Sequence, residues 1–222
     1  MIFDLNNTAE FPDPRYGHPS GFYAVGGDLS PARLIKAYPK GIFPWYAFKE
    51  GNIHWWAPQK RFVIIPDEIH ISHSMRNLMN KRRLKCTINE DFEGVIYGCC
   101  HIDQRVEDPD AWLGPELMDT WMELHKRGYA KSVEVWDEED FLVGGLYGFV
   151  SGGCFIGDSM FSIEPSASKL ALIHLARHMK ENGGILIDCQ LETKHLKSMG
   201  GKYISYEEYF KATLESEPIP WD

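Results

Sequence analysis

The stretch between Ser132 and Phe161 constrains the fold more than any other part of the sequence. Residues 132–136 alternate between polar and apolar side chains, which is typical of a strand with one buried face. An acidic turn, Asp137 to Asp140, leads into the apolar and glycine-rich run 141–148, so the pattern predicts a β-hairpin. Two adjacent glycines then predict a turn into a third strand, 154–161. The chain therefore contains an antiparallel sheet in its second half.

Helical patterns surround these strands, and their ends carry the usual signals. Pro115 opens a helix that ends at Lys126, and Ser205 with Glu208 forms a capping box for a C-terminal helix. Further helices are expected at 72–81, 166–180 and 194–199, and further short strands at 62–65, 185–190 and 203–205. Strands and helices in this order are typical of a mixed α/β (α+β) domain like that of the N-acetyltransferases, the GNAT-like acyltransferase fold.

The first 62 residues follow a different pattern. Ser30 is placed to cap a short helix, 32–38, with Pro31 at its first position, where the missing N–H costs nothing. The stretch 42–58 is dense in aromatic residues and broken by prolines, so it cannot be a regular helix. We predict two domains, a small N-terminal domain, 1–62, and a GNAT-like domain, 63–222.

The composition is that of an ordinary globular protein, with 44% hydrophobic and 25% charged residues. No apolar run approaches the roughly 20 residues that a membrane span needs, which excludes a membrane protein. Residues 1–10 contain nothing that resembles a secretory signal or a transit peptide. We therefore expect a cytoplasmic protein with no membrane partner.

The five cysteines favour a reducing compartment, because they are odd in number and irregularly spaced. Cys99, Cys100 and His101 stand together, but adjacent side chains on a strand point to opposite faces. No second Cys or His pair stands at ligand spacing either. We interpret these residues as strand positions without structural zinc, and we expect no metal.

The net charge of −9 argues against nucleic acid as a partner, but the charge is unevenly distributed. Residues 70–89 contain five cations and no acid, namely Arg76, Lys81, Arg82, Arg83 and Lys85. We call these five residues the basic run. In isolation, such a run fits a solvent-exposed helix face better than a contact for phosphates.

The sequence also argues against coenzyme A as the acyl carrier. An acetyltransferase binds the pyrophosphate of acetyl-CoA with a glycine-rich loop ahead of its main helix, where backbone N–H groups attract anions. The residues ahead of the helix 166–180 are Ile163, Glu164 and Pro165, and an acid there would repel a pyrophosphate. We therefore expect an acyl donor other than acetyl-CoA and no cofactor.

Several motifs, in one order across nearly the whole chain, resemble the leucyl/phenylalanyl-tRNA–protein transferase family. They include Gly-Gly-Asp-Leu-Ser at 26–30, Gly-Ile-Phe-Pro-Trp at 41–45, Trp-Trp-Ala-Pro at 55–58, Leu-Val-Gly-Gly-Leu-Tyr-Gly at 142–148 and Leu-Ile-Asp-Cys-Gln at 186–190. The resemblance implies an enzyme that moves Leu or Phe, and also Met, from charged tRNA onto the N-terminal Lys or Arg of acceptor proteins, which marks them for degradation. It also implies no metal and no CoA.

The resemblance assigns residues to the aminoacyl-tRNA. Trp45 and Trp112 would stack on either side of the 3′-terminal adenine, at ~1–3 kcal/mol per base, unless both are core tryptophans. An apolar pocket for the donor side chain is implied at Leu146, Phe155, Met160 and Leu172, although a plain hydrophobic core would use the same residue types. The basic run would contact the acceptor stem, because phosphate contacts position RNA without reading its sequence.

The acceptor protein is expected to meet three polar residues. Asp158 would bind the guanidinium or ammonium of its first residue through charge-assisted hydrogen bonds, although the family usually has Glu at this position. Asp188 and Gln190 are two apart on an expected strand, so they would share a face and the carboxylate could orient the amide that touches the attacking amine. The vicinal 2′-OH of the ribose is an alternative carrier for the proton.

Two other functions stay open at this point. The chain could be a weakly active module that binds basic N-termini, with Asp158 in place of Glu as a sign of lost activity. It could also be a CoA-dependent N-acetyltransferase, although the pyrophosphate loop is missing. For the transferase, we expect a monomer.

Overall fold

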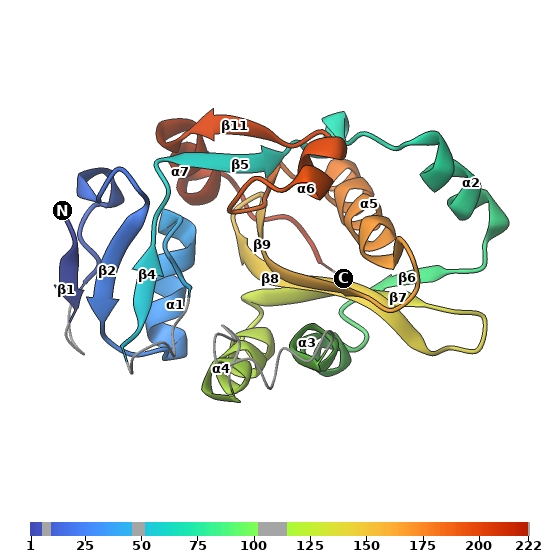
Figure 1. Ribbon diagram of the computed structural model, residues 1–222, viewed down its shortest axis with the longest axis horizontal. Helices are drawn as coiled ribbons and strands as arrows, with labels where there is room; N and C mark the ends of the chain where they lie inside the picture. Colours follow the sequence, from blue (N-terminus) through green and yellow to red (C-terminus); the bar gives the residue numbers. More distant parts are fainter. Residues whose placement is uncertain (6–9, 46–51, 102–114, 222) are drawn as a thin grey trace.

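The computed structural model describes residues 1–5, 10–45, 52–101 and 115–221, which form two β-sheets with helices packed around them (Figure 1). The larger sheet is seven-stranded, in the order β11-β5-β10-β9-β8-β7-β6. Its strands are β5 Lys60–Ile64, β6 Lys85–Ile88, β7 Ala130–Trp136, β8 Leu142–Ser151, β9 Cys154–Ser162, β10 Leu186–Asp188 and β11 Lys202–Ser205. Strands β10 and β9 are parallel, whereas the other pairs among these strands are antiparallel. The predicted mixed sheet is therefore confirmed.

Helices cover both faces of this sheet (Figure 1). Helix α5, Ala167–Glu181, lies on one face, and α3, Phe92–His101, and α4, Pro115–Lys126, lie on the other. The glycine-rich run in β8 explains how closely α5 approaches, because a Cβ at Gly144 would lie 2.5 Å from the Cβ of Ala167. A larger residue at this position would push the helix away from the sheet.

The predicted helix ends are confirmed where capping chemistry defined them. Helix α2 is His73–Lys81, and the Ser72 side chain accepts a hydrogen bond from the backbone N–H of Met75. Helix α6 is Lys194–Ser198, and α7 is Tyr206–Glu215, which begins with the predicted capping box between Ser205 and Glu208. No helix in the described part of the chain is long and apolar enough to cross a membrane.

Helix α3 corrects the interpretation of the cysteine pair. Cys99, Cys100 and His101 lie on a helix and not on a strand. The buried residues of α3 recur at helical spacing, Phe92, Val95, Ile96, Cys99 and Cys100, and this period gives them one face against the sheet. His101 is exposed and stacks on Tyr97. Among the described residues, no group of three His, Cys, Asp or Glu side chains could hold a metal ion.

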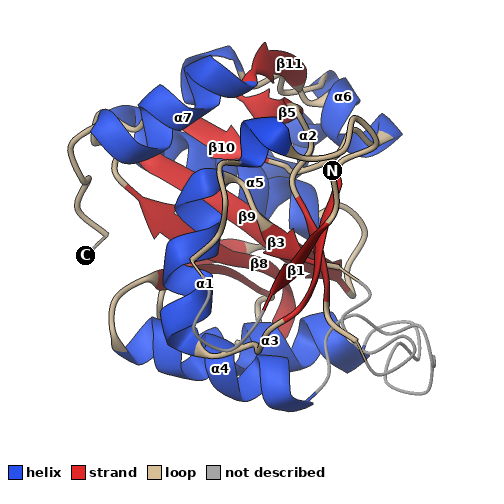
Figure 2. Cartoon of the chain, turned by 90° about the vertical axis from the view of Figure 1, so that its left-hand side faces the viewer, coloured by secondary structure: helices blue, strands red, loops and turns tan. Residues whose placement is uncertain are grey.

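The smaller sheet has the order β1-β2-β4-β3 and lies beside the larger one (Figure 2). Its strands are β1 Phe3–Leu5, β2 Phe22–Gly26, β3 Phe43–Pro44 and β4 His54–Trp56. Helix α1, Pro31–Ala37, packs beside it and is capped by Ser30 with Pro31 in its first turn, as predicted. A single turn of 3₁₀ helix, η2, Tyr38–Lys40, follows and ends at Gly41, whose φ of 68° favours glycine.

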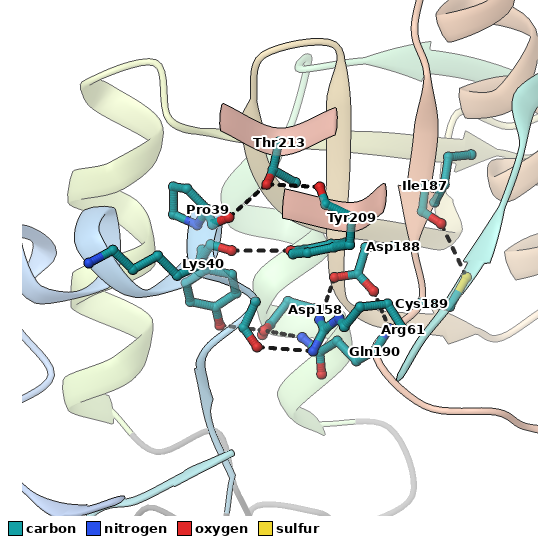
Figure 3. Close-up of polar contacts among 12 residues, drawn as sticks. Pro39, Lys40, Arg61, Asp158, Ile187, Asp188, Cys189, Gln190, Tyr209 and Thr213 are labelled. Atoms are coloured by element: carbon teal, nitrogen blue, oxygen red, sulfur yellow. Dashed lines mark hydrogen bonds and ion pairs between the residues drawn. The ribbon is translucent and has the colours of Figure 1, made fainter. Parts of the chain in front are cut away.

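Helix α7 fastens η2 to the larger sheet. The Thr213 hydroxyl donates to the carbonyl of Pro39 (2.7 Å) (Figure 3). The Tyr206 hydroxyl donates to that of Lys40 (2.7 Å) and the Tyr209 hydroxyl to that of Tyr38 (3.2 Å). These bonds satisfy carbonyl groups at the end of a helix that would otherwise lack partners. The side chain of Tyr38 is thereby directed toward β9. The boundary at residue 62 stays a prediction, and it falls within β5.

Candidate active site

A cavity of about 480 Å³ opens where β3, the β8–β9 hairpin, the end of β10 and helices α5 and α6 meet. Most of the residues that the sequence analysis selected line it. They are Trp45, Leu146, Phe155, Asp158, Met160, Leu172, Asp188 and Gln190. The cavity has two chemically different regions. One is an apolar wall, and the other is lined by Tyr147, Asp158 and Gln190, which together with Tyr38 we call the polar group.

The apolar wall contains all four residues predicted for the donor pocket. Leu146 and Phe155 come from the hairpin and Leu172 from α5, and each of the three is at most 3% exposed. Met160, on β9, is half-buried. Leu175, Ile187 and Leu196 extend the same wall. The cavity can therefore enclose an apolar side chain of moderate size.

Asp158 is the centre of the polar group. Its carboxylate accepts hydrogen bonds from the hydroxyls of Tyr38 (2.6 Å) and Tyr147 (2.9 Å) and from the side-chain amide of Gln190 (3.4 Å). Burial raises the pKa of this carboxyl to about 6, and the three donors partly oppose that rise because they stabilise the anion. Burial also raises the pKa of both tyrosines, so they stay neutral donors at physiological pH.

Asp188 is fully buried and forms an ion pair with Arg61, which is also fully buried (Figure 3). Arg61 lies on β5 between the rings of Phe43 and Tyr209, and it donates to the carbonyl of Gly41 (3.0 Å). A buried charge without a partner would cost several kcal/mol, so each member of the pair requires the other. Sequence reasoning missed Arg61. The signal was an arginine at the start of an otherwise apolar strand, because a buried arginine requires an acidic partner.

The expected geometry of Asp188 and Gln190 is wrong. Strand β10 ends at Asp188, and Gln190 adopts the left-handed region with a φ of 58°, so the two residues are not on one face of a strand. Asp188 instead accepts a hydrogen bond from the backbone N–H of Gln190 (2.8 Å). A short carboxylate commonly binds a backbone N–H two residues on, and this local turn competes with the strand. Asp188 therefore orients Gln190 through its backbone, and the Gln190 side chain turns toward Asp158 (Figure 3).

The two predicted adenine-stacking residues differ in what can be said of them. Trp45 lines the cavity, directly after β3, and its ring packs edge-on against Trp56 with centroids 5.4 Å apart. Its backbone N–H donates to the carbonyl of His54 (2.9 Å), which extends the β3–β4 pairing. Trp112 lies outside the described residues.

The basic run lies away from the cavity. Arg76 and Lys81 are on α2, Arg82 and Arg83 are in the turn that follows it, and Lys85 begins the edge strand β6. All five side chains are exposed, and none lines the cavity. Figure 1 shows α2 at the opposite end of the larger sheet from the smaller sheet. The run is therefore a surface feature and not part of the cavity wall.

The mixed sheet, the apolar wall and the adjoining polar group together define a mixed α/β protein with one site for an apolar group beside a polar one. The chain belongs to the leucyl/phenylalanyl-tRNA–protein transferase family. The family described as "Leucyl/phenylalanyl-tRNA protein transferase" matches residues 63–214, and its N-terminal domain matches residues 27–59. The recognition made from the sequence motifs is confirmed.

Two curated relatives agree with this assignment. A leucyl/phenylalanyl-tRNA–protein transferase of Syntrophus aciditrophicus is 46% identical over 94% of this chain and 86% of its own length. One of Pseudomonas fluorescens (strain Pf0-1) is 45% identical over 91% of this chain and 89% of its own length. Among solved structures, L-PGS from Bacillus licheniformis is similar over 79% of this chain and 55% of that chain, at 14% identity and a TM-score of 0.39.

Proposed function

We propose that this enzyme transfers Leu, Phe or Met from an aminoacyl-tRNA onto the N-terminal Lys or Arg of an acceptor protein, which marks the acceptor for degradation. One observation carries the proposal. A single cavity joins an apolar wall, suited to the donor side chain, to a buried carboxylate and a fixed amide, suited to the acceptor. Transfer requires these two substrates to meet in one place.

The donor is already activated, because its amino acid is held in an ester. The side chain enters between Leu146, Phe155, Met160 and Leu172, and a flexible thioether adapts to both branched and flat shapes. Such a pocket discriminates by only ~1–3 kcal/mol per methylene, so Leu, Phe and Met overlap as donors. The terminal adenine stacks on Trp45 at the edge of the cavity, with Trp112 proposed on its other face.

The acceptor is bound at the polar group. A carboxylate offers about four sites for hydrogen bonds, and three donors already reach Asp158, so one site remains for the cation of an N-terminal Lys or Arg. The Gln190 amide orients the neutral α-amine, whose ordinary pKa of about 8 leaves a useful neutral fraction at physiological pH. The amine attacks the ester carbonyl, the new C–N bond forms, and the ester C–O bond breaks with the 3′ oxygen as the leaving group.

The proton from the amine has two possible routes. The Asp188–Gln190 pair can hold the amine while the proton leaves, or the vicinal 2′-OH of the ribose can carry the proton to the departing oxygen. A donor with a 2′-deoxyadenosine end separates them. Retained turnover supports the protein side chains, and lost turnover supports the ribose hydroxyl.

The remaining contacts are those of the whole tRNA. The basic run binds the phosphates of the acceptor stem, which suits an enzyme that accepts more than one tRNA. The reaction takes place in the cytoplasm, where charged tRNA is available and the free cysteines stay reduced. The enzyme acts as a monomer and without a cofactor.

The deciding experiment is transfer of radiolabelled Leu or Phe from charged tRNA to two peptides that differ only in beginning with Arg or Ala. We expect label on the Arg peptide alone. Label on both peptides would remove the acceptor assignment of Asp158. Transfer to neither, with the Arg peptide still bound, would indicate a module that only binds basic N-termini, and binding of acetyl-CoA would revive an acetyltransferase.

A further inference from the structure

The residues that follow α7 include a tryptophan that packs against a residue of the donor pocket. The Trp221 side chain is 8% exposed and belongs to the same apolar cluster as Leu146, Phe155 and Leu172. Its ring contacts that of Phe155, with centroids 5.7 Å apart and planes at 43°. Phe155 lines the cavity, whereas Trp221 does not. Trp221 is therefore a second layer of the pocket wall.

Trp221 is held in place by both surfaces around it. Its carbonyl accepts a hydrogen bond from the Asn89 amide (3.1 Å), and the neighbouring Pro220 carbonyl accepts one from the His178 ring (3.0 Å). The ring of His178, on α5, also packs against the indole with centroids 5.2 Å apart. The indole is thus wedged between α5 and β9 and cannot move freely.

The position of the Phe155 ring depends on the Trp221 indole beside it. The ring lies against the backbone of Gly148 so closely that a Cβ there would come within 2.7 Å of the Phe155 Cε1. A strand backbone within a sheet cannot yield, so the Phe155 ring has no room on that side. The side chain behind it, Trp221, therefore determines how far the ring can withdraw from the cavity.

We propose that Trp221 is a specificity-determining residue that sets the depth of the donor pocket through Phe155 without touching the substrate. The inference rests on the proposed function, since it assigns the pocket to the donor side chain. With the indole present, Phe155 is held forward and the pocket is shallow. With a smaller residue, Phe155 can withdraw and the pocket gains room for a flat aromatic donor.

The test is the relative affinity of two non-hydrolysable donor analogues, leucyl- and phenylalanyl-adenosine with an amide in place of the ester, measured by calorimetry. Trp221→Leu should raise the preference for the phenylalanyl analogue by about 10-fold, the lower end of what a methylene-sized change in an apolar pocket gives. A matched control is Trp136→Leu, because Trp136 is at the far end of β7 and donates to Thr87. The control should leave the ratio unchanged.

An unchanged ratio in a folded Trp221→Leu protein would overturn the inference. If that variant does not fold, Trp221→Phe should give a smaller shift in the same direction, and no shift would again overturn it. The proposed function fails in a separate way. In that case the wild-type protein binds both analogues but transfers neither Leu nor Phe from charged tRNA to the Arg peptide. If the wild-type protein binds neither analogue, the donor pocket is wrongly assigned. That result would overturn both the role of Trp221 and the proposed function.

Discussion

At the scale of single residues, the site depends on how one carboxylate and one amide are held. Asp158 is surrounded by three donors, and Gln190 is fixed in a left-handed conformation by the carboxylate of Asp188. A non-glycine residue in this conformation costs ~1–3 kcal/mol, which the surrounding structure must supply. Both features indicate that the positions of these side chains are set before any substrate arrives.

Gln190→Ala should lower turnover by about 100-fold, a typical effect for the loss of a preorganised hydrogen-bonding group. The α-amine would lose the group that orients it, while the donor pocket would stay intact. Single-turnover transfer to an Arg peptide measures the effect, and affinity for the leucyl-adenosine analogue serves as the control. Full turnover in this variant would remove Gln190 from the mechanism.

Asp158 makes both activity and stability depend on pH. Its pKa of about 6 lies above the ordinary value of about 3.9, so the folded protein binds the proton more tightly than the unfolded chain. Its contribution to stability is complete below pH ~4 and is lost as the pH rises through about 6. Asp158→Asn should therefore gain unfolding free energy relative to wild type between pH 4 and 7, in urea titrations.

The same carboxyl should shape the pH profile of transfer. Binding of a cationic acceptor needs the anion, so kcat/KM for an Arg peptide should fall as the pH drops below about 6. In Asp158→Asn this acid limb should be absent and the overall rate low. An acid limb that persists unchanged in the variant would place the titrating group elsewhere.

At the scale of elements, hydrogen bonds from α7 hold η2 in place, and Tyr38 is part of η2. Three side chains of α7 donate to carbonyls of η2, so any loss of order in the first turn of α7 should reach the polar group. The capping box at Ser205 is exposed and lies outside the cavity, so it can be changed to test how much the cap contributes to holding α7.

Ser205→Ala should lower the unfolding free energy by ~1 kcal/mol, because an N-cap side chain satisfies an otherwise unpaired N–H. Ser205→Gly should cost only a few tenths of a kcal/mol by the same reasoning. Urea denaturation followed by circular dichroism measures both. Equal losses in the two variants would show that the cap contributes little and that α7 is held by its packing alone.

The elements also show what the sequence could predict. Helices with a cap or a proline at one end, such as α1, α2 and α4, have the expected bounds within a residue or two, because local hydrogen bonds define them. Helix α3 was missed because its face contains two glycines and a cysteine pair, which are not typical of a helix. Its start does carry a signal, since the Asp91 side chain accepts a hydrogen bond from the backbone N–H of Gly94 (2.9 Å). Arg61 was missed because its partner, Asp188, is 127 positions away in the sequence. The turn at Gln190 is local, but the apolar run before it predicts a strand that continues through residue 190.

At the scale of the whole molecule, the basic run and the cavity are separate surfaces that one tRNA would have to bridge. The chain carries a net charge of −9, so long-range repulsion of RNA must be overcome locally. The run is exposed, and none of its five cations forms an ion pair with another described residue. Its charges are therefore available to phosphates.

Replacing Lys81, Arg82 and Arg83 with Gln should weaken the binding of charged tRNA. The slope of log affinity against log salt concentration should also become shallower, by about one for each phosphate contact that is lost. Transfer from a minimal aminoacyl-adenosine donor should be unaffected, because these side chains lie outside the cavity. A matched control replaces three other exposed lysines outside the cavity, Lys60, Lys126 and Lys211, with Gln. An equal weakening in the control would mean that total charge matters and not the position of the run.

The attachment of η2 to α7 also has a consequence for synthesis on the ribosome. Tyr38 leaves the ribosome early, whereas its turn is secured by Tyr206, Tyr209 and Thr213, more than 160 positions later. The donors around Asp158 can be completed only after that late helix has emerged. A nascent chain that has already made most of its sheet is therefore still inactive, and competence appears only once α7 has been translated.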